Sequence, residues 1–180
     1  MKIIAFAGMP FSGKSEAVKI AKNLDIPVIR MGDMVWEETK NRGLELNDKN
    51  VGTIANNMRK EHGMDIWAKK TLEKIKSLED EKLLVIDGVR NIEEIELFEK
   101  KLGKDFFLIG VQVSDEKRYK RAMIRGRKDD SQDIDLIKGR DKRELSWGLG
   151  NVIASADIVI SNEGTVEEFS KKIKDLFNKI

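Results

Sequence analysis

Short, nearly continuous runs of hydrophobic residues alternate along the chain with longer segments in which hydrophobic residues recur every three or four positions. The first run, residues 2–7, reads Lys-Ile-Ile-Ala-Phe-Ala, and similar runs occupy residues 28–29, 83–86, 106–113 and 156–160. Such runs are typical of strands that are buried on both faces of a parallel sheet. The sequence therefore predicts five parallel strands separated by helices.

Helical spacing of hydrophobic residues fills the segments between these strands. Residues 15–24 predict a helix directly after the first strand, and Asn91–Glu94 and Thr165–Glu168 have the spacing of capping boxes at two further helix starts. No strand-like run occurs between the second and third strands, where we expect helices at about 33–41, 48–61 and 65–78. We expect one α/β domain over residues 1–180, with a helical insertion at about 33–81.

A glycine-rich segment joins the first strand to the first helix, and it fits the phosphate-loop pattern G-x-x-x-x-G-K-[ST]. Backbone N–H groups of such a loop surround the phosphates of a nucleotide, and the positive end of the following helix adds to the attraction. The lysine contacts the same phosphates, and the last hydroxyl is a Mg²⁺ ligand. The matching residues are Gly8, Met9, Pro10, Phe11, Ser12, Gly13, Lys14 and Ser15.

Phe11 is a bulky residue at a variable position of this loop. If the loop requires a positive φ there, a side chain costs about 1–2 kcal/mol relative to glycine. We interpret the ring as a cover on the outer side of a working loop.

Composition limits the possible function classes. The 180 residues include 34 basic and 32 acidic residues and no cysteine. A general nucleic-acid-binding protein would have a large basic excess, and disulfides or thiolate metal sites require cysteine. No apolar run approaches the ~18 residues of a membrane span. We therefore expect a cytoplasmic protein with no nucleic-acid or membrane partner; the sequence does not predict the oligomeric state.

Asp87 ends the third predicted strand and is a candidate Mg²⁺ ligand. It is followed by glycine, so the Asp-Glu pair typical of motor ATPases and helicases is missing, and no Asn-Lys-x-Asp motif of GTPases follows any strand. Small kinases are the large class that remains. Their chemistry needs positive charge around the transferred phosphoryl group, and Arg118, Arg121 and Arg125 recur on one predicted helix face, with Arg140 and Arg143 downstream.

Several segments resemble known nucleotide kinases. Ile26–Met34 looks like the start of the monophosphate-binding region of adenylate kinases, and Asp87-Gly88-x-Arg90 is similar to their Asp-Gly-Phe-Pro-Arg. Residues 156–165 resemble dephospho-coenzyme A kinase. The whole chain resembles an archaeal family of P-loop kinase-like proteins related to both enzymes. The implied fold is that of nucleoside-monophosphate kinases: three layers, a parallel five-stranded sheet, a helical insertion and a short lid at about 125–132.

The resemblance also implies roles for individual residues. Lys14, Arg121, Arg125 and one of Arg140 or Arg143 would hold the transferred phosphoryl group, and Ser15 and Asp87 would bind Mg²⁺. Arg90 would bind the acceptor, with Arg59 as a second candidate contact, beside Gly32 and Trp36. Asp33 falls where dephospho-coenzyme A kinases have a possible base. The loop after the last strand, which would pack against adenine, comprises Asn162, Glu163 and Gly164.

The implied activity is transfer of the γ-phosphoryl group of Mg·ATP to a small nucleotide-like acceptor such as AMP. Two alternatives remain open. A base at Asp33 favours a hydroxyl acceptor such as dephospho-coenzyme A, because an alcohol must lose a proton. Trp36 stands where adenylate kinases have an acceptor-binding arginine, and the lid is short. These two departures favour an adenine-nucleotide-binding regulator with little turnover.

Overall fold

The sheet of the protein is parallel throughout, as predicted. A computed structural model describes residues 1–78, 80–124 and 133–180. Its strands follow the order β2-β3-β1-β4-β5, so the first strand lies in the middle and all carboxyl ends point to one edge. The strands are β1 (Lys2–Ala7), β2 (Val28–Arg30), β3 (Leu83–Asp87), β4 (Phe106–Gln112) and β5 (Ile158–Ser161).

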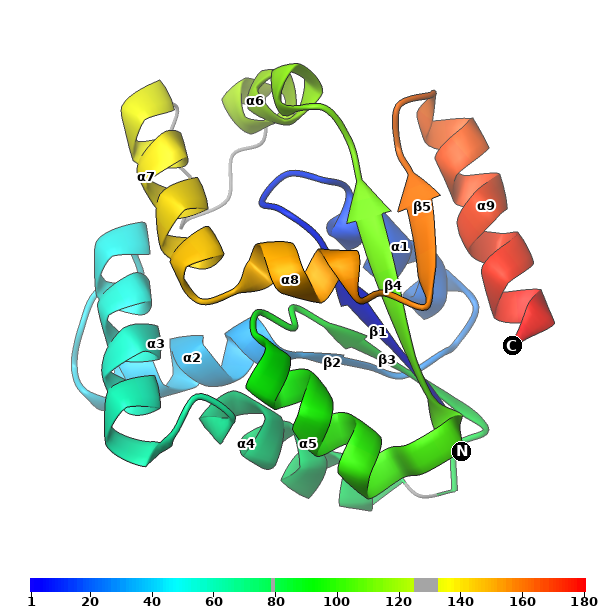
Figure 1. Ribbon diagram of the computed structural model, residues 1–180, viewed down its shortest axis with the longest axis horizontal. Helices are drawn as coiled ribbons and strands as arrows, with labels where there is room; N and C mark the ends of the chain where they lie inside the picture. The colour runs from blue at the N-terminus through cyan, green and yellow to red at the C-terminus, as the bar shows by residue number, and fades with distance from the viewer. Residues whose placement is uncertain (79, 125–132) are drawn as a thin grey trace.

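Helices cover both faces of this sheet (Figure 1). Because side chains alternate along a strand, Ile4 and Phe6 of β1 pack on α1 (Lys14–Asn23) and α9 (Val166–Lys179). Ile3 and Ala5 point to the other face. The helices on that side include α4 (Ile66–Ile75), α5 (Ile92–Leu102) and α8 (Leu149–Ala154). The result is the three-layer arrangement expected from the sequence.

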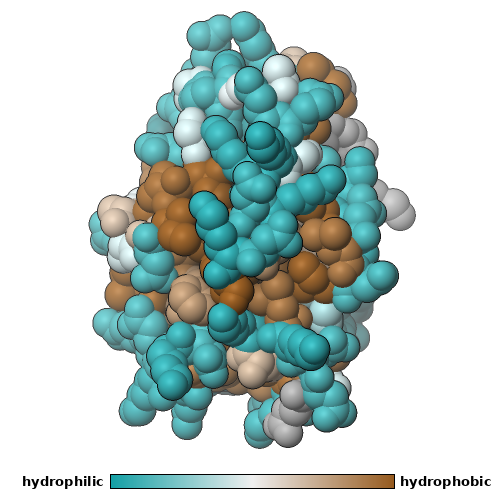
Figure 2. Space-filling model, turned by 90° about the vertical axis from the view of Figure 1, so that its right-hand side faces the viewer, coloured by the Kyte–Doolittle hydropathy of each residue, from teal (hydrophilic) through white to brown (hydrophobic). Residues whose placement is uncertain are grey.

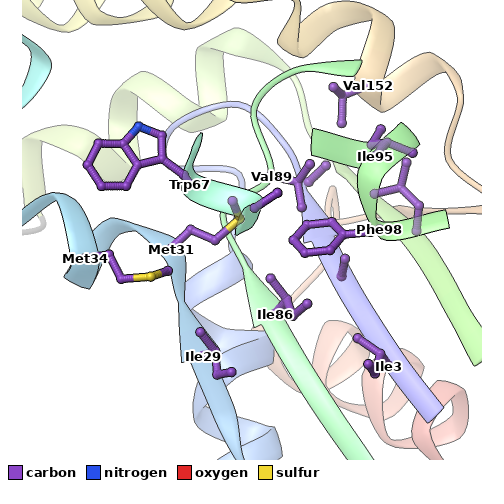
Figure 3. Close-up of a cluster of buried hydrophobic side chains, with 14 of the residues drawn as sticks. Ile3, Ile29, Met31, Met34, Trp67, Ile86, Val89, Ile95, Phe98 and Val152 are labelled. Atoms are coloured by element: carbon purple, nitrogen blue, oxygen red, sulfur yellow. The ribbon is translucent and has the colours of Figure 1, made fainter. Parts of the chain in front are cut away.

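The core on that second face joins the sheet to the helical insertion. Figure 3 shows side chains from the central strands lying against side chains of α5 and α8 and, further along, of α2 and α4. Trp67 is 1% exposed and belongs to this core. Burial of large apolar side chains is the main favourable term in folding. The labelled residues are Ile3, Ile29, Met31, Met34, Trp67, Ile86, Val89, Ile95, Phe98 and Val152.

The insertion between β2 and β3 contains the three predicted helices. They are α2 (Met31–Asn41), α3 (Asp48–His62) and α4, which is extended by a 3₁₀ turn at Lys76–Leu78. A second 3₁₀ turn, Gly103–Asp105, precedes β4. After β4 come α6 (Asp115–Ile124) and α7 (Ile134–Ser146). The predicted lid at 125–132 lies outside the described residues.

One of the two predicted capping boxes is complete. Thr165 accepts a hydrogen bond from the N–H of Glu168, whose carboxylate accepts from the N–H of Thr165. The box at Asn91 has only its first half. Asn91 accepts from the N–H of Glu94, but the Glu94 carboxylate accepts from the N–H of Arg90 instead. That part of the prediction was wrong because Glu94 also pairs with the buried Arg59.

The last strand begins two residues later than predicted. Asp157 precedes β5, and its carboxylate accepts a hydrogen bond from the N–H of Leu108 at 2.7 Å. The hydrophobic run alone gave no sign of this side-chain contact.

Figure 2 shows the face that carries α9, where hydrophilic side chains run over the middle and hydrophobic areas lie on both sides. Exposed large hydrophobic residues of the elements on this side include Ile158 and Val159 of edge strand β5 and Val166 of α9. Among the helices of the described ranges, none combines the length and apolar character needed to cross a membrane.

Candidate active site

The phosphate loop lies at the carboxyl end of the central strand β1, and its glycines are required by close contacts. A Cβ on Gly8 would lie 2.6 Å from the carbonyl oxygen of Val111 in β4. Gly13 has φ of +112°, and a Cβ there would lie 2.1 Å from Nδ2 of Asn162. Any side chain at Gly13 would therefore be both strained and obstructed. The loop is held between β4 and the segment that follows β5.

Phe11 has the positive φ considered in the sequence analysis, at +63°. The residue is 7% exposed, and it packs against Ala122 of α6, Ile137 of α7 and Tyr119. The ring therefore lies between the loop and these two helices, and its burial offsets the backbone strain.

We predict that Phe11→Gly destabilises the protein. Glycine relieves strain of about 1–2 kcal/mol, but loss of a buried phenylalanine ring costs about 3–5 kcal/mol. The expected net loss is about 2 kcal/mol, measured by denaturant unfolding. Phe11→Leu keeps most of the apolar contact and is expected to lose less. A glycine variant as stable as the parent would show that the ring adds nothing to packing.

Lys14 is the first residue of α1 and donates hydrogen bonds to the carbonyl oxygens of Gly8 and Met9, at 2.5 and 3.1 Å. Burial, together with the positive charge of the nearby Arg90, lowers the pKa of its ammonium group from the ordinary 10.5 to about 8. Asp87 and Glu144 act in the opposite direction. Lys14 is thus a cation held inside a cavity, where charge interactions are strong.

The residues proposed to hold Mg²⁺ fit a magnesium site. Asp87 ends β3 next to Phe6 of β1, and its Oδ1 is buried with no hydrogen-bond partner among the described residues. Its Oδ2 lies 3.9 Å from Nε of Arg30. Ser15 lines the same cavity. In the described ranges, no cluster of three or more His, Cys, Asp or Glu residues can hold a metal alone. The Oδ1 of Asp87, unpartnered among the residues that the structure describes, suits Mg²⁺, which usually binds through one or two carboxylates, waters and substrate phosphates.

Arg121 of α6 connects the phosphate loop to the segment after β5. Its guanidinium donates to the carbonyl oxygens of Ser12 and Asn162, at 3.3 and 3.0 Å. Asn162 is buried and donates from Nδ2 to the same Ser12 carbonyl at 2.8 Å. Glu163 instead points to the surface, where Ser114 and Lys117 bind its carboxylate. Gly164 is exposed next to the Thr165 cap.

Arg118 has a different role from Arg121, although both lie on the predicted basic face of α6. Its side chain is 2% exposed, pairs with Asp141 of α7 at 2.7 Å and donates to the carbonyl oxygen of Pro10 at 3.0 Å. Tyr119 also donates to Asp141. We call Arg118, Tyr119 and Asp141 the α6–α7 clamp. The clamp fixes the tip of the phosphate loop against two helices.

The cavity extends from the phosphate loop to the helical insertion and has a volume of about 400 Å³. Gly32 and Trp36 of α2 line it, and the Arg30 guanidinium lies 5.6 Å from the centre of the Trp36 ring. Asp33 is 48% exposed at its side chain, pairs with Arg30 at 3.3 Å, and is not among the described residues that line the cavity. Arg125 lies outside the described residues. The cavity lining also includes Arg59, Arg90, Arg121, Arg140 and Arg143.

Carboxylates that the sequence analysis missed pair with most of these arginines. Glu94 pairs with Arg59 at 3.2 Å, and Asp48 of α3 with Arg143 at 2.7 Å. Burial lowers the pKa of Arg59 and raises that of Glu94, although each partner opposes the change in the other. Two nitrogens of Arg59, Nε and Nη1, are buried with no hydrogen-bond partner in the described part of the chain, and Trp147 stacks on its guanidinium at 4.3 Å.

Glu144 of α7 pairs with two arginines at once. Its Oε2 lies 3.1 Å from Nη1 of Arg90, and its Oε1 accepts from Nε of Arg140 at 3.1 Å. Burial alone would raise the pKa of this carboxyl group, but Arg90, Arg140 and Lys14 outweigh burial and lower it to about 2. Only the i, i+4 spacing to Arg140 hinted at this contact in the sequence.

The comparisons with solved structures agree on the fold. Shikimate kinase from Aquifex aeolicus shares 19% identity, with a TM-score of 0.53 over 98% of this chain and 96% of that chain. The protein TT1252 from Thermus thermophilus shares 17% identity, with a TM-score of 0.63 over 99% and 97%. At this level of identity the likeness shows the fold, which is that of P-loop kinases related to nucleoside-monophosphate kinases.

Sequence relatives extend over the whole chain. Residues 7–138 match the family described as an AAA domain. A UPF0200 protein of Methanosarcina acetivorans is 48% identical over 99% of this chain and 95% of its own length. A UPF0200/UPF0201 protein of Archaeoglobus fulgidus is 44% identical over all of this chain and 56% of its own length. The predicted resemblance to an archaeal P-loop kinase-like family is confirmed, and the chain belongs to the UPF0200 protein family.

Proposed function

We propose that this protein is an ATP-dependent phosphotransferase that moves the γ-phosphoryl group of Mg·ATP to a nucleotide-like acceptor such as a nucleoside monophosphate. A P-loop kinase-like fold supports nucleotide binding and a kinase-type activity. One observation carries the proposal further. A single cavity joins the phosphate loop to the helical insertion and is lined by arginines on both sides. Phosphoryl transfer depends mainly on positioning and on positive charge, which this cavity provides.

On the donor side, the loop N–H groups, Lys14 and Arg121 would hold the phosphates of ATP. Arg121 already donates to two backbone carbonyl oxygens, so its guanidinium needs little reorganisation when phosphates bind. Ser15 and Asp87 would hold Mg²⁺, which neutralises charge on the β- and γ-phosphates when bound. Asn162 lines the cavity next to Gly13, on the side where we place the adenine.

On the acceptor side, Trp36 and Trp147 line the cavity, each with a guanidinium group over its ring, and Arg59, Arg90, Arg140 and Arg143 lie in the same lining. A base that packs against these aromatic side chains and a phosphate near an arginine would use both kinds of group. Arg90 lies between Lys14 of the phosphate loop and α7, because it lowers the pKa of Lys14 and also pairs with Glu144 of α7. We assign it to the acceptor.

A second candidate is transfer to a hydroxyl group of the acceptor. Ion pairing of the acceptor-side arginines favours it, since Arg59, Arg90 and Arg143 each have a carboxylate partner. An arginine that already has a carboxylate partner attracts a phosphate dianion less strongly than an unpaired arginine does. Asp33 does not support this candidate as a base, because its carboxylate is exposed and paired with Arg30.

The experiment that tests the proposed function is an ADP-formation assay with Mg·ATP. The acceptors are nucleoside monophosphates, dephospho-coenzyme A and small alcohols. ADP formed only with a monophosphate supports the first candidate, and ADP formed only with a hydroxyl acceptor supports the second. Tight ATP binding without ADP from any acceptor contradicts both and supports a regulator with little turnover.

Nucleotide affinity is expected to depend on the protonation of Lys14. The ammonium form, present below a pH of about 8, attracts phosphates, and bound phosphates raise the pKa of Lys14 again. Affinity for Mg·ADP should therefore be constant below pH 8 and fall as the pH rises above it, by up to about tenfold per pH unit. Titration calorimetry across pH 6.5–9.5 measures this. The Lys14→Met variant should bind Mg·ADP weakly, and its affinity should show no change of slope with pH near pH 8. A wild-type affinity that stays constant to pH 9.5 would contradict the assignment.

A further inference from the structure

Glu144 is the carboxylate at the centre of the arginine cluster. Its side chain is 3% exposed, and it faces guanidinium groups from two separate elements, Arg90 after β3 and Arg140 on its own helix α7. Lys14 of the phosphate loop is close enough to lower its pKa. A negative group therefore already occupies the place where donor-side and acceptor-side cations meet.

This negative charge is permanent at physiological pH. Arg90, Arg140 and Lys14 keep the carboxyl group ionised far below neutral pH, although burial opposes ionisation. A carboxylate of so low a pKa is a poor base. It does not titrate in a pH range where it would accept a proton from a substrate, so its effect on an acceptor is electrostatic.

The cost of this arrangement points to a role beyond stability. A buried carboxylate is expensive to desolvate, and replacement of a whole buried ion pair by apolar side chains is often neutral or stabilising. The two paired arginines retain exposed surface, since the side chains of Arg90 and Arg140 are 21% and 17% exposed. Both arginines therefore remain in reach of a ligand while Glu144 holds part of their charge.

We propose that Glu144 is the specificity-determining residue of the acceptor side, and that it selects acceptors whose reacting group is uncharged, such as a hydroxyl, against acceptors that bring a phosphate dianion to Arg90. A dianion at Arg90 would lie beside a fixed negative charge that has already engaged both arginines. Repulsion of this kind rejects a wrong ligand without improving the right one. The role of Glu144 deepens the second candidate of the proposed function, transfer to a hydroxyl group, and rests on it; it counts against the first candidate.

The test measures binding, with the donor site filled. The wild-type chain is saturated with Mg²⁺ and a non-hydrolysable ATP analogue, and AMP or inorganic phosphate is then titrated by calorimetry. Glu144→Gln and Glu144→Met remove the charge, and two variants are available so that the failure of one to fold does not end the test. Glu144→Asp keeps the charge. Glu38→Gln is the matched control, because Glu38 of α2 pairs with Arg42, which follows that helix, and neither residue is among the described residues that line the cavity.

We expect the charge-removing variants to bind AMP or phosphate at least about tenfold more tightly than the wild type. Glu144→Asp and Glu38→Gln should remain weak. Equal anion affinity in the wild type and in the charge-removing variants would overturn the role of Glu144, as would a gain of affinity in Glu144→Asp that matches theirs. Failure of the proposed function looks different: the wild type would form no ADP with any acceptor, whatever its anion affinity.

Discussion

Lys14→Ala is expected to abolish phosphoryl transfer, with kcat reduced about a hundredfold or more, while the chain still folds. The ammonium group is the cation of the phosphate loop and is held in place by the Gly8 and Met9 carbonyl oxygens. Its contact with the transferred group strengthens as charge develops in the transition state. Steady-state kinetics with the best acceptor from the ADP assay measures the loss.

Stability provides the control for this variant. Burial keeps the pKa of Lys14 below its unfolded value, so the charged side chain is a cost to folding that is present below pH 8 and is relieved as the pH rises toward 10.5. Lys14→Ala should therefore be at least as stable as the wild type at pH 7. Lys19→Ala, an exposed residue on the same helix, should leave turnover unchanged. Unchanged turnover in Lys14→Ala would rule out this loop as the active site.

Asp141→Ala is expected to cause the largest loss of stability. It leaves the Arg118 guanidinium buried beside Pro10 and paired only with the exposed Asp115. Removal of one partner of a buried ion pair costs about 3–5 kcal/mol. For a chain of this size that is a fall of roughly 10 °C in Tm. Differential scanning calorimetry measures it, and nucleotide affinity should fall too, because the clamp fixes the loop tip.

A double variant separates the buried charge from the packing. Arg118→Met with Asp141→Leu replaces the pair by apolar side chains, and such replacements are often neutral or stabilising. It should recover most of the Tm that Asp141→Ala loses. Glu116→Ala removes an exposed i, i+4 partner of Lys120 and should leave Tm unchanged. A double variant less stable than Asp141→Ala would show that the charges themselves hold the two helices together.

The sequence predicted the fold and the place of the phosphate loop because their signals are local. The phosphate loop is eight adjacent residues, and each strand is a nearly continuous apolar run. The ion pairs of the arginines were harder to predict, because the state of an arginine depends on a partner far along the chain. Arg118 and Arg121 are three residues apart on one helix face, yet only Arg118 meets Asp141, 23 residues away. Arg59 likewise meets Glu94, 35 residues away.

The spacing rule for capping boxes also predicted a wrong partner for Glu94, because a residue distant in the sequence competes for its carboxylate. Glu94 stands at the position that completes a capping box with Asn91, and local geometry favours that contact. Instead, one oxygen of the carboxylate pairs with Arg59 of the insertion, and the second oxygen accepts a hydrogen bond from the N–H of Arg90. Local patterns therefore predicted where α5 begins but not which groups satisfy its first turn.

Helix α7, which carries Asp141 of the α6–α7 clamp and also Glu144, has a thermodynamic consequence for substrate binding. Asp141 and Glu144 are neighbours on successive turns of one helix. Asp141 holds Arg118, which contacts the loop that would receive ATP, and Glu144 pairs with the arginine assigned to the acceptor. A shift of α7 that follows occupation of the loop must move both contacts together. Each substrate would then change the affinity for the other by the same factor, since linkage between two sites is reciprocal. Titrations in both orders of addition would show that factor, and independent affinities would show that α7 does not move.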